Sequence, residues 1–86
     1  MELSVKHARK VKCKTRFCEW LYMELERTNM TMEEVGNKIN RSSQLISGLA
    51  TGRIKPNKLH AIGLCYAFKS LDDPDWVWSL SNEELT

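Results

Sequence analysis

The 86-residue sequence has little glycine, proline or cysteine: four, two and three residues respectively. So few glycines and prolines argue against a linker or a collagen-like chain, and an apolar fraction of 42% argues against intrinsic disorder. The longest apolar run, residues 61–68, is far shorter than the ~20 residues of a membrane helix. The first residues are charged, with no apolar segment behind them, so we expect no secretory signal and one small cytoplasmic domain away from membranes.

The Cys-x-x-Cys spacing of zinc modules is also absent. Cys13, Cys18 and Cys65 are expected to be reduced thiols, because their number is odd and no export signal precedes them. A zinc site that combines them with His7 and His60 is the alternative, but the spacings match no known ligand pattern. The sequence indicates no glycine-rich phosphate loop, no pocket with paired carboxylates and no nucleophile partner for either histidine. We therefore expect no metal, no cofactor and no enzymatic activity.

Acidic residues are missing from a long internal stretch, residues 35–71, which carries six basic side chains. Residues 1–16 carry six more basic side chains and a single acid. The net charge is +6 for residues 1–58 and −4 for residues 59–86. This polarity favours a basic face for a polyanion and an acidic end away from it, although a merely solvated basic surface has the same composition.

Helical periodicity runs through most of the chain, and no alternation is long enough for a strand. The predicted helices span about residues 15–27, 31–39, 42–51, 58 to 69 or 70, and 73–80. Thr31, Ser42 and Asn57 are predicted N-caps, while Asn40 and Gly52 tolerate the left-handed backbone at helix ends. The fourth helix is apolar nearly all round and is predicted to be the core helix of an all-α domain with four or five helices.

Two of these helices, joined by Asn40-Arg41, have the pattern of a helix-turn-helix. Residues 31–53 resemble the Cro and lambda-type repressor helix-turn-helix family without gaps, and the likeness extends loosely over residues 17–70. Gly36 falls where the family has a small residue at a close crossing, and Asn40 where the turn requires a positive φ. The apolar positions that lock the two helices together hold Val35, Ile39, Ile46 and Leu49. The resemblance implies a lambda-repressor-like fold that binds double-stranded DNA.

In this family the helix predicted at 42–51 enters the major groove, where its first side chains reach base edges. The resemblance implies base contacts by Ser43, Gln44 and Ser47, with Gln44 the best reader because its amide both donates to and accepts from adenine. Phosphate contacts are implied for Thr31, Arg41, Ser42, Thr51, Arg53, Lys55 and Lys58. Met32 and Gly48 depart from the family, which often has a phosphate-contacting Gln or Thr at the first position and a long groove-entering side chain at the second. Gly48 indicates either a close approach to DNA or a neighbouring helix, or a tolerated small residue.

The segments that flank the DNA-binding domain (residues 15–71) are less regular. Residues 1–14 are either a flexible basic arm or an extension of the first helix. The cations expected to follow phosphates or enter the minor groove are Lys6, Arg9, Lys10, Lys12, Lys14 and Arg16. In the acidic segment 72–86, Trp76 and Trp78 point to different faces of a short helix. One is expected to cover the core and the other to contact a second copy in a dimer, unless both fold back onto the core.

The expected function is sequence-specific transcriptional regulation by a Cro-type repressor of a phage or mobile element. A homodimer would bind a palindromic operator in the cytoplasm of a bacterial host. The alternative is a protein-interaction module, such as a helix-turn-helix antitoxin, whose acidic residues 71–86 bind a partner protein.

Overall fold

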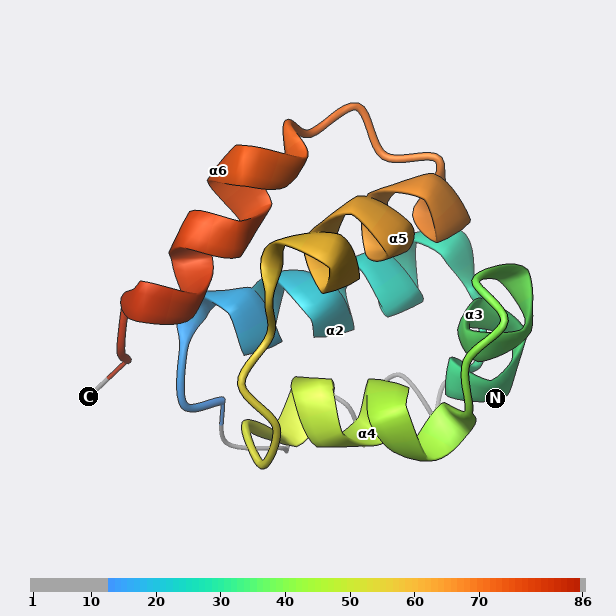
Figure 1. Ribbon diagram of the computed structural model, residues 1–86, viewed down its shortest axis with the longest axis horizontal. Helices are drawn as coiled ribbons and strands as arrows, with labels where there is room; N and C mark the ends of the chain where they lie inside the picture. Colours follow the sequence, from blue (N-terminus) through green and yellow to red (C-terminus); the bar gives the residue numbers. More distant parts are fainter. Residues whose placement is uncertain (1–12, 86) are drawn as a thin grey trace.

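The computed structural model describes residues 13–85, and these form helices arranged around one core (Figure 1). The elements in chain order are α2 (Arg16–Thr28), α3 (Met32–Lys38), α4 (Ser43–Thr51), α5 (Lys58–Phe68), α6 (Pro74–Ser79) and the short 3-10 helix η1 (Leu80–Asn82). Within this range there is no strand, only an isolated bridge between Thr15 and Glu84. No helix there has the length and apolar character that crossing a bilayer requires. The predicted all-α class is confirmed, and the predicted helix ends differ from the observed ones by about one or two residues.

Local caps set the helix boundaries. The side chains of Thr31, Ser42 and Asn57 each accept a backbone N–H from the third residue of the helix that follows, so the three predicted N-caps are confirmed. At the first and last of these caps a side chain also bonds back to the cap, from Glu34 and His60 respectively. Left-handed residues follow the ends of helices at Asn29, Asn40, Gly52 and Lys69.

Each helix contributes one apolar face to the core. The buried residues include Phe17, Trp20 and Leu21 from α2, Val35 from α3, Ile46 and Leu49 from α4, Ala61, Leu64 and Phe68 from α5, and Val77 and Leu80 from α6 and η1. Full burial of a large apolar side chain contributes about 1.5–3 kcal/mol. Because Val77 and Leu80 lie in the same cluster as Phe17, the C-terminal segment belongs to the same core as the first described helix.

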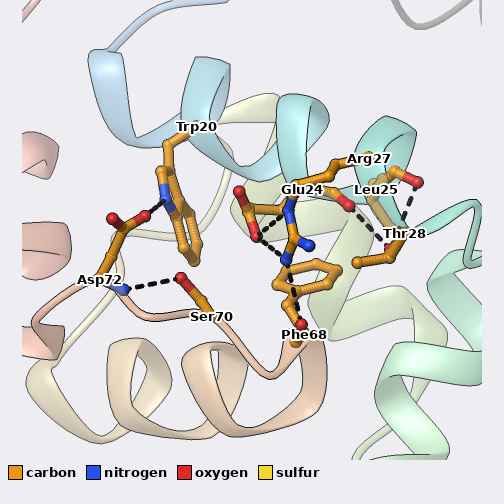
Figure 2. Close-up of polar contacts among 8 residues, drawn as sticks. All are labelled: Trp20, Glu24, Leu25, Arg27, Thr28, Phe68, Ser70 and Asp72. Atoms are coloured by element: carbon orange, nitrogen blue, oxygen red, sulfur yellow. Dashed lines mark hydrogen bonds and ion pairs between the residues drawn. The ribbon is translucent and has the colours of Figure 1, made fainter.

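Polar contacts fix α2 against the C-terminal end of α5 (Figure 2). The indole N–H of Trp20 donates to Asp72 Oδ2 at 2.9 Å. Arg27 Nη2 donates to Glu24 Oε1 at 2.6 Å and to the carbonyl of Phe68 at 3.1 Å. The guanidinium therefore satisfies both a nearly buried carboxylate and a carbonyl of the last turn of α5, which would otherwise have no helical partner. Together these bonds hold α5 and the following loop in place.

Helix α5 contributes five buried residues to the core, as predicted for the core helix, but its apolar residues are not all covered. Ala61, Leu64 and Phe68 are buried, but α5 lies at the surface and exposes an apolar stripe, which comprises Leu59, Ile62 and Tyr66. The chain is too short to cover both sides of this helix.

The aromatic side chains of α6 flank the face of the helix that enters the core. Val77 and Leu80 enter the core, because their spacing of three residues puts them on one helical face. Trp76 and Trp78 are on either side of that face and stay 46% and 39% exposed. Both indoles are therefore partly exposed beside the core, and the cover and dimer-contact roles given to them stay predictions.

Candidate nucleic-acid interface

The link between α3 and α4 is four residues long, 39–42, and it turns back tightly on α3. The carbonyl of Gly36 accepts the N–H groups of Ile39 at 3.2 Å and Arg41 at 2.7 Å. A Cβ on Gly36 would lie 2.5 Å from the carbonyl oxygen of Arg41, a distance that backbone atoms do not tolerate. Asn40 has the positive φ, 59°, that the sequence predicted. The close approach predicted at Gly36 is therefore found, and the neighbouring group is the backbone of the turn.

Helix α4 has one face in the core and one face in solvent. Ile46, Leu49 and Ala50 are buried against the other helices. The outer face comprises Ser43, Gln44, Ser47 and Thr51, of which the first two are exposed and the others half-buried. At ~100° per residue these four side chains lie within about 100° of one another. In Figure 1, α4 lies along the lower edge of the molecule, below α2 and α5. The outer face is thus polar and uncharged, and it points to solvent because the opposite side of α4 is packed in the core.

Gly48 is buried by the loop that follows α4, not by another helix. The N–H of Ile54 donates to the carbonyl of Gly48 at 3.0 Å, and the Ile54 side chain occupies the space that a Cβ on Gly48 would enter. Arg53 Nη2 would lie 3.2 Å from such a Cβ. The close approach at Gly48 is therefore to the basic loop, residues 53–57, which none of the sequence alternatives named. This packing fixes the loop directly against α4.

Cations lie at both ends of the outer face. Arg41 is exposed in the turn before α4, and Arg53 and Lys55 are exposed in the basic loop after it. None of these three forms an ion pair with another residue of the described range. The alkyl chain of Lys14 crosses Gly52, with Cδ 3.0 Å from the position of a Cβ there. The segment at 13–15 and the basic loop meet near the C-terminal end of α4 (Figure 1).

Two of the cations predicted to contact DNA are engaged elsewhere. Lys58 Nζ lies 3.1 Å from Asp75 Oδ1, and Arg16 Nη1 lies 3.4 Å from Glu83 Oε1. Both pairs are about half exposed, and pairs of this kind contribute at most ~1 kcal/mol, so they can be exchanged for phosphate. Arg16 is the first residue of α2 and not part of an arm. The remaining predicted arm cations, Lys6, Arg9, Lys10 and Lys12, lie outside the described residues. An uninterrupted extension of α2 through Thr15 toward the N-terminus is wrong, because residues 13–15 are not helical and Thr15 is the extended N-cap of α2.

The predicted hydroxyl contacts already have local partners. Thr31 and Ser42 accept N–H groups of the first turns of α3 and α4 as N-caps. The hydroxyl of Thr51 donates to the carbonyl of Ser47 at 2.9 Å. Each cap oxygen is occupied, but its O–H hydrogen is still able to donate to an acceptor such as a phosphate.

Burial shifts the pKa values of two side chains of α5, His60 and Cys65. His60 Nδ1 accepts the N–H of Asn57, and burial together with the nearby charge of Arg41 lowers the pKa of the imidazole. Burial, reinforced by Asp72, raises the pKa of the Cys65 thiol to about 11, so it is protonated at neutral pH and a poor metal ligand or nucleophile. In the part of the chain that is described, no three His, Cys, Asp or Glu side chains gather as a metal site.

Comparison of the chain with models of protein families, with curated proteins and with solved structures gives no match. What the surface can do therefore follows from its geometry. The outer face of α4 is about 14 Å long, since a helix rises ~1.5 Å per residue. It has cations beyond both ends and lies within the acid-free stretch 35–71. Such a surface attracts a polyanion and presents neutral hydrogen-bonding groups to it.

Proposed function

We propose that the chain is a sequence-specific regulator of transcription that binds double-stranded DNA in the manner of the Cro and lambda-type repressors. The observation that carries this proposal is the outer face of α4, which is polar, exposed at its N-terminal turn and flanked by the cations Arg41, Arg53 and Lys55. A tight turn built on Gly36 holds this face in a fixed relation to α3.

The dimensions of α4 suit the major groove of B-DNA, which is ~12 Å wide and admits one helix. In this arrangement Ser43 and Gln44 approach the base edges, with Ser47 one turn further along. The cations at the two ends of the helix contact the phosphates of the strands that border the groove. Neutral side chains therefore select the sequence, while the cations supply affinity for any duplex.

The regulator is proposed to act as a homodimer on a palindromic operator, as a repressor of a phage or mobile element. Two half-sites are read by two copies of α4, and the symmetry of the protein is then repeated in the DNA. The half-exposed Trp76 and Trp78 are the proposed dimer contacts, because large aromatic surfaces are common at the centres of interfaces.

Selection of bound sequences from a random pool of duplexes tests this function. The full chain is expected to enrich one sequence with two-fold symmetry, because each outer face reads one half-site. A matched control is Lys38→Ala, which removes an exposed cation from a groove that α3 shares with α5 and is expected to leave the selected sequence unchanged. A pool without any enriched sequence would contradict the proposal.

The second candidate function is binding to a different protein, as in a helix-turn-helix antitoxin. It is favoured by the exposed apolar residues of α5, α6 and their connection: Leu59, Ile62, Tyr66, Leu71, Trp76 and Trp78.

Sedimentation of the wild type, Trp76→Ala and Trp78→Ala distinguishes self-association from binding of another protein. The wild type is expected to be a dimer and at least one variant a monomer, because loss of a central aromatic contact costs ~2 kcal/mol or more. A wild type that is monomeric at high concentration, both free and on DNA, would rule out this dimer and favour the second candidate.

A further inference from the structure

The end of the chain pairs with the segment that precedes α2. The N–H of Arg16 donates to the carbonyl of Glu83 at 2.8 Å, and the N–H of Leu85 donates to the carbonyl of Lys14 at 2.9 Å. Thr15 and Glu84 lie opposite each other as an antiparallel bridge. We call residues 83–85 the C-terminal strap. It begins three residues after Leu80, which is buried in the core, so its position is tied to the rest of the fold.

The strap lies close to Lys14 and Lys55, two of the cations beyond the C-terminal end of α4. A groove of about 700 Å³ is bordered by Lys14 on one side, by Lys55 and Pro56 of the basic loop on another, and by Glu84 and Leu85 of the strap. Lys14 leaves this junction across Gly52, the left-handed residue that ends α4. Since Gly52 has no side chain, the alkyl chain of Lys14 rests directly on the helix end.

We propose, on the basis of the proposed function, that the strap is a positioning element that holds Lys14 as a phosphate contact beside Arg53 and Lys55. A lysine in a frayed terminus loses rotamer and backbone freedom when it binds phosphate, and this loss opposes binding. Here the backbone of Lys14 is already bonded to Leu85, and its side chain lies against Gly52. The freedom of Lys14 is therefore largely lost before DNA arrives.

The backbone of the strap and its carboxylates are expected to have opposite effects on the affinity for duplex DNA. The bond from Leu85 to Lys14 positions a cation, whereas the side chain of Glu84 adds a negative charge beside the same groove. A tail that acted only through its charge would weaken binding of duplex DNA. A positioning strap strengthens it, so the sign of the change on breaking the backbone pairing separates the two.

The test compares Leu85→Pro with Leu85→Ala in the full chain, on a 20-bp duplex of random sequence at several KCl concentrations. Proline removes the N–H that donates to Lys14, whereas alanine keeps it. We expect Leu85→Pro to weaken binding about five- to tenfold at 0.1 M KCl and to lower the salt slope by about one, as for one lost phosphate contact. Leu85→Ala is expected to keep the wild-type slope.

The Lys14→Gln variant tests whether the strap and Lys14 act together. Alone it is expected to have the same effect as Leu85→Pro, and in the Leu85→Pro background it is expected to change little. An undiminished effect of Lys14→Gln in that background, or a wild-type slope for Leu85→Pro, overturns the strap's role while leaving DNA binding intact. A wild type without salt-dependent binding to the duplex overturns the proposed function and this inference together. Hydrogen exchange checks that proline opens only the strap: the N–H of Arg16, protected in the wild type and in Leu85→Ala, should exchange fast in Leu85→Pro, while the amides within α2, α4 and α5 stay protected.

Discussion

Gly36→Ala is expected to lower the thermal unfolding midpoint substantially, although alanine normally stabilises a helix relative to glycine. The new Cβ would lie 2.5 Å from the carbonyl oxygen of Arg41 and 3.2 Å from backbone atoms of Ser42. Backbone atoms cannot rotate away, so the turn must open, and overpacking of this kind costs about 1–3 kcal/mol. In a domain of this size each kcal/mol lowers the midpoint by about 4–8 °C. Calorimetry or circular dichroism during heating measures the change.

Gly63→Ala is the matched control, because it makes the same chemical change within α5. There the new Cβ would lie 3.5 Å from Ile39 Cγ2, an ordinary van der Waals contact. The helix gains up to ~1 kcal/mol from the lower entropy of the unfolded chain, so this variant is expected to melt at or above the wild-type midpoint. Equal midpoints for the two variants would show that the turn after α3 is not as tight as described.

Gln44→Ala is expected to weaken binding to the selected operator by about 1–3 kcal/mol and binding to a scrambled duplex much less. Gln44 is exposed in the first turn of α4, on the outer face, and its amide is able to form two hydrogen bonds with one adenine. Preference at one base pair in each half-site should therefore be relaxed. Titrations on both duplexes at two salt concentrations measure the effect.

Arg53→Ala provides the contrast for this readout. Arg53 is exposed in the basic loop without an ion-pair partner among the described residues. Its loss should therefore weaken binding to the operator and to the scrambled duplex equally, and it should lower the salt slope of binding by about one. Lys58 is the poorer choice, because its pairing with Asp75 already offsets part of its charge. If Gln44→Ala lowers both affinities by the same factor, Ser43 or Ser47 is the base reader instead.

Sequence reasoning predicted those parts of the fold that short-range chemistry determines. The caps at Thr31, Ser42 and Asn57 depend on an oxygen and an N–H three residues away, and the left-handed backbone of Asn40 and Gly52 depends on the residue itself. The outer face of α4 followed from the same periodicity, because apolar residues at helical spacing leave the opposite side to solvent.

Long-range contacts were beyond such reasoning. Nothing in the local sequence pairs Lys14 with Leu85, or Lys58 with Asp75, because these contacts exist only once the helices have packed. The exposure of Trp76 and Trp78 depends on packing in the same way: Val77 and Leu80 occupy the core, and the two indoles stay partly exposed. The burial of Gly48 likewise required the position of Ile54.

The division of α4 into two faces has a consequence for how this protein can change over generations. Ser43 and Gln44 contribute to no apolar cluster, whereas Ile46 and Leu49 on the opposite side carry the packing. Substitutions at exposed positions of this kind usually alter folding free energy by no more than ~0.5 kcal/mol. Under the proposed function, target preference would therefore diverge among descendants of this chain one exposed residue at a time, at little cost in folding free energy.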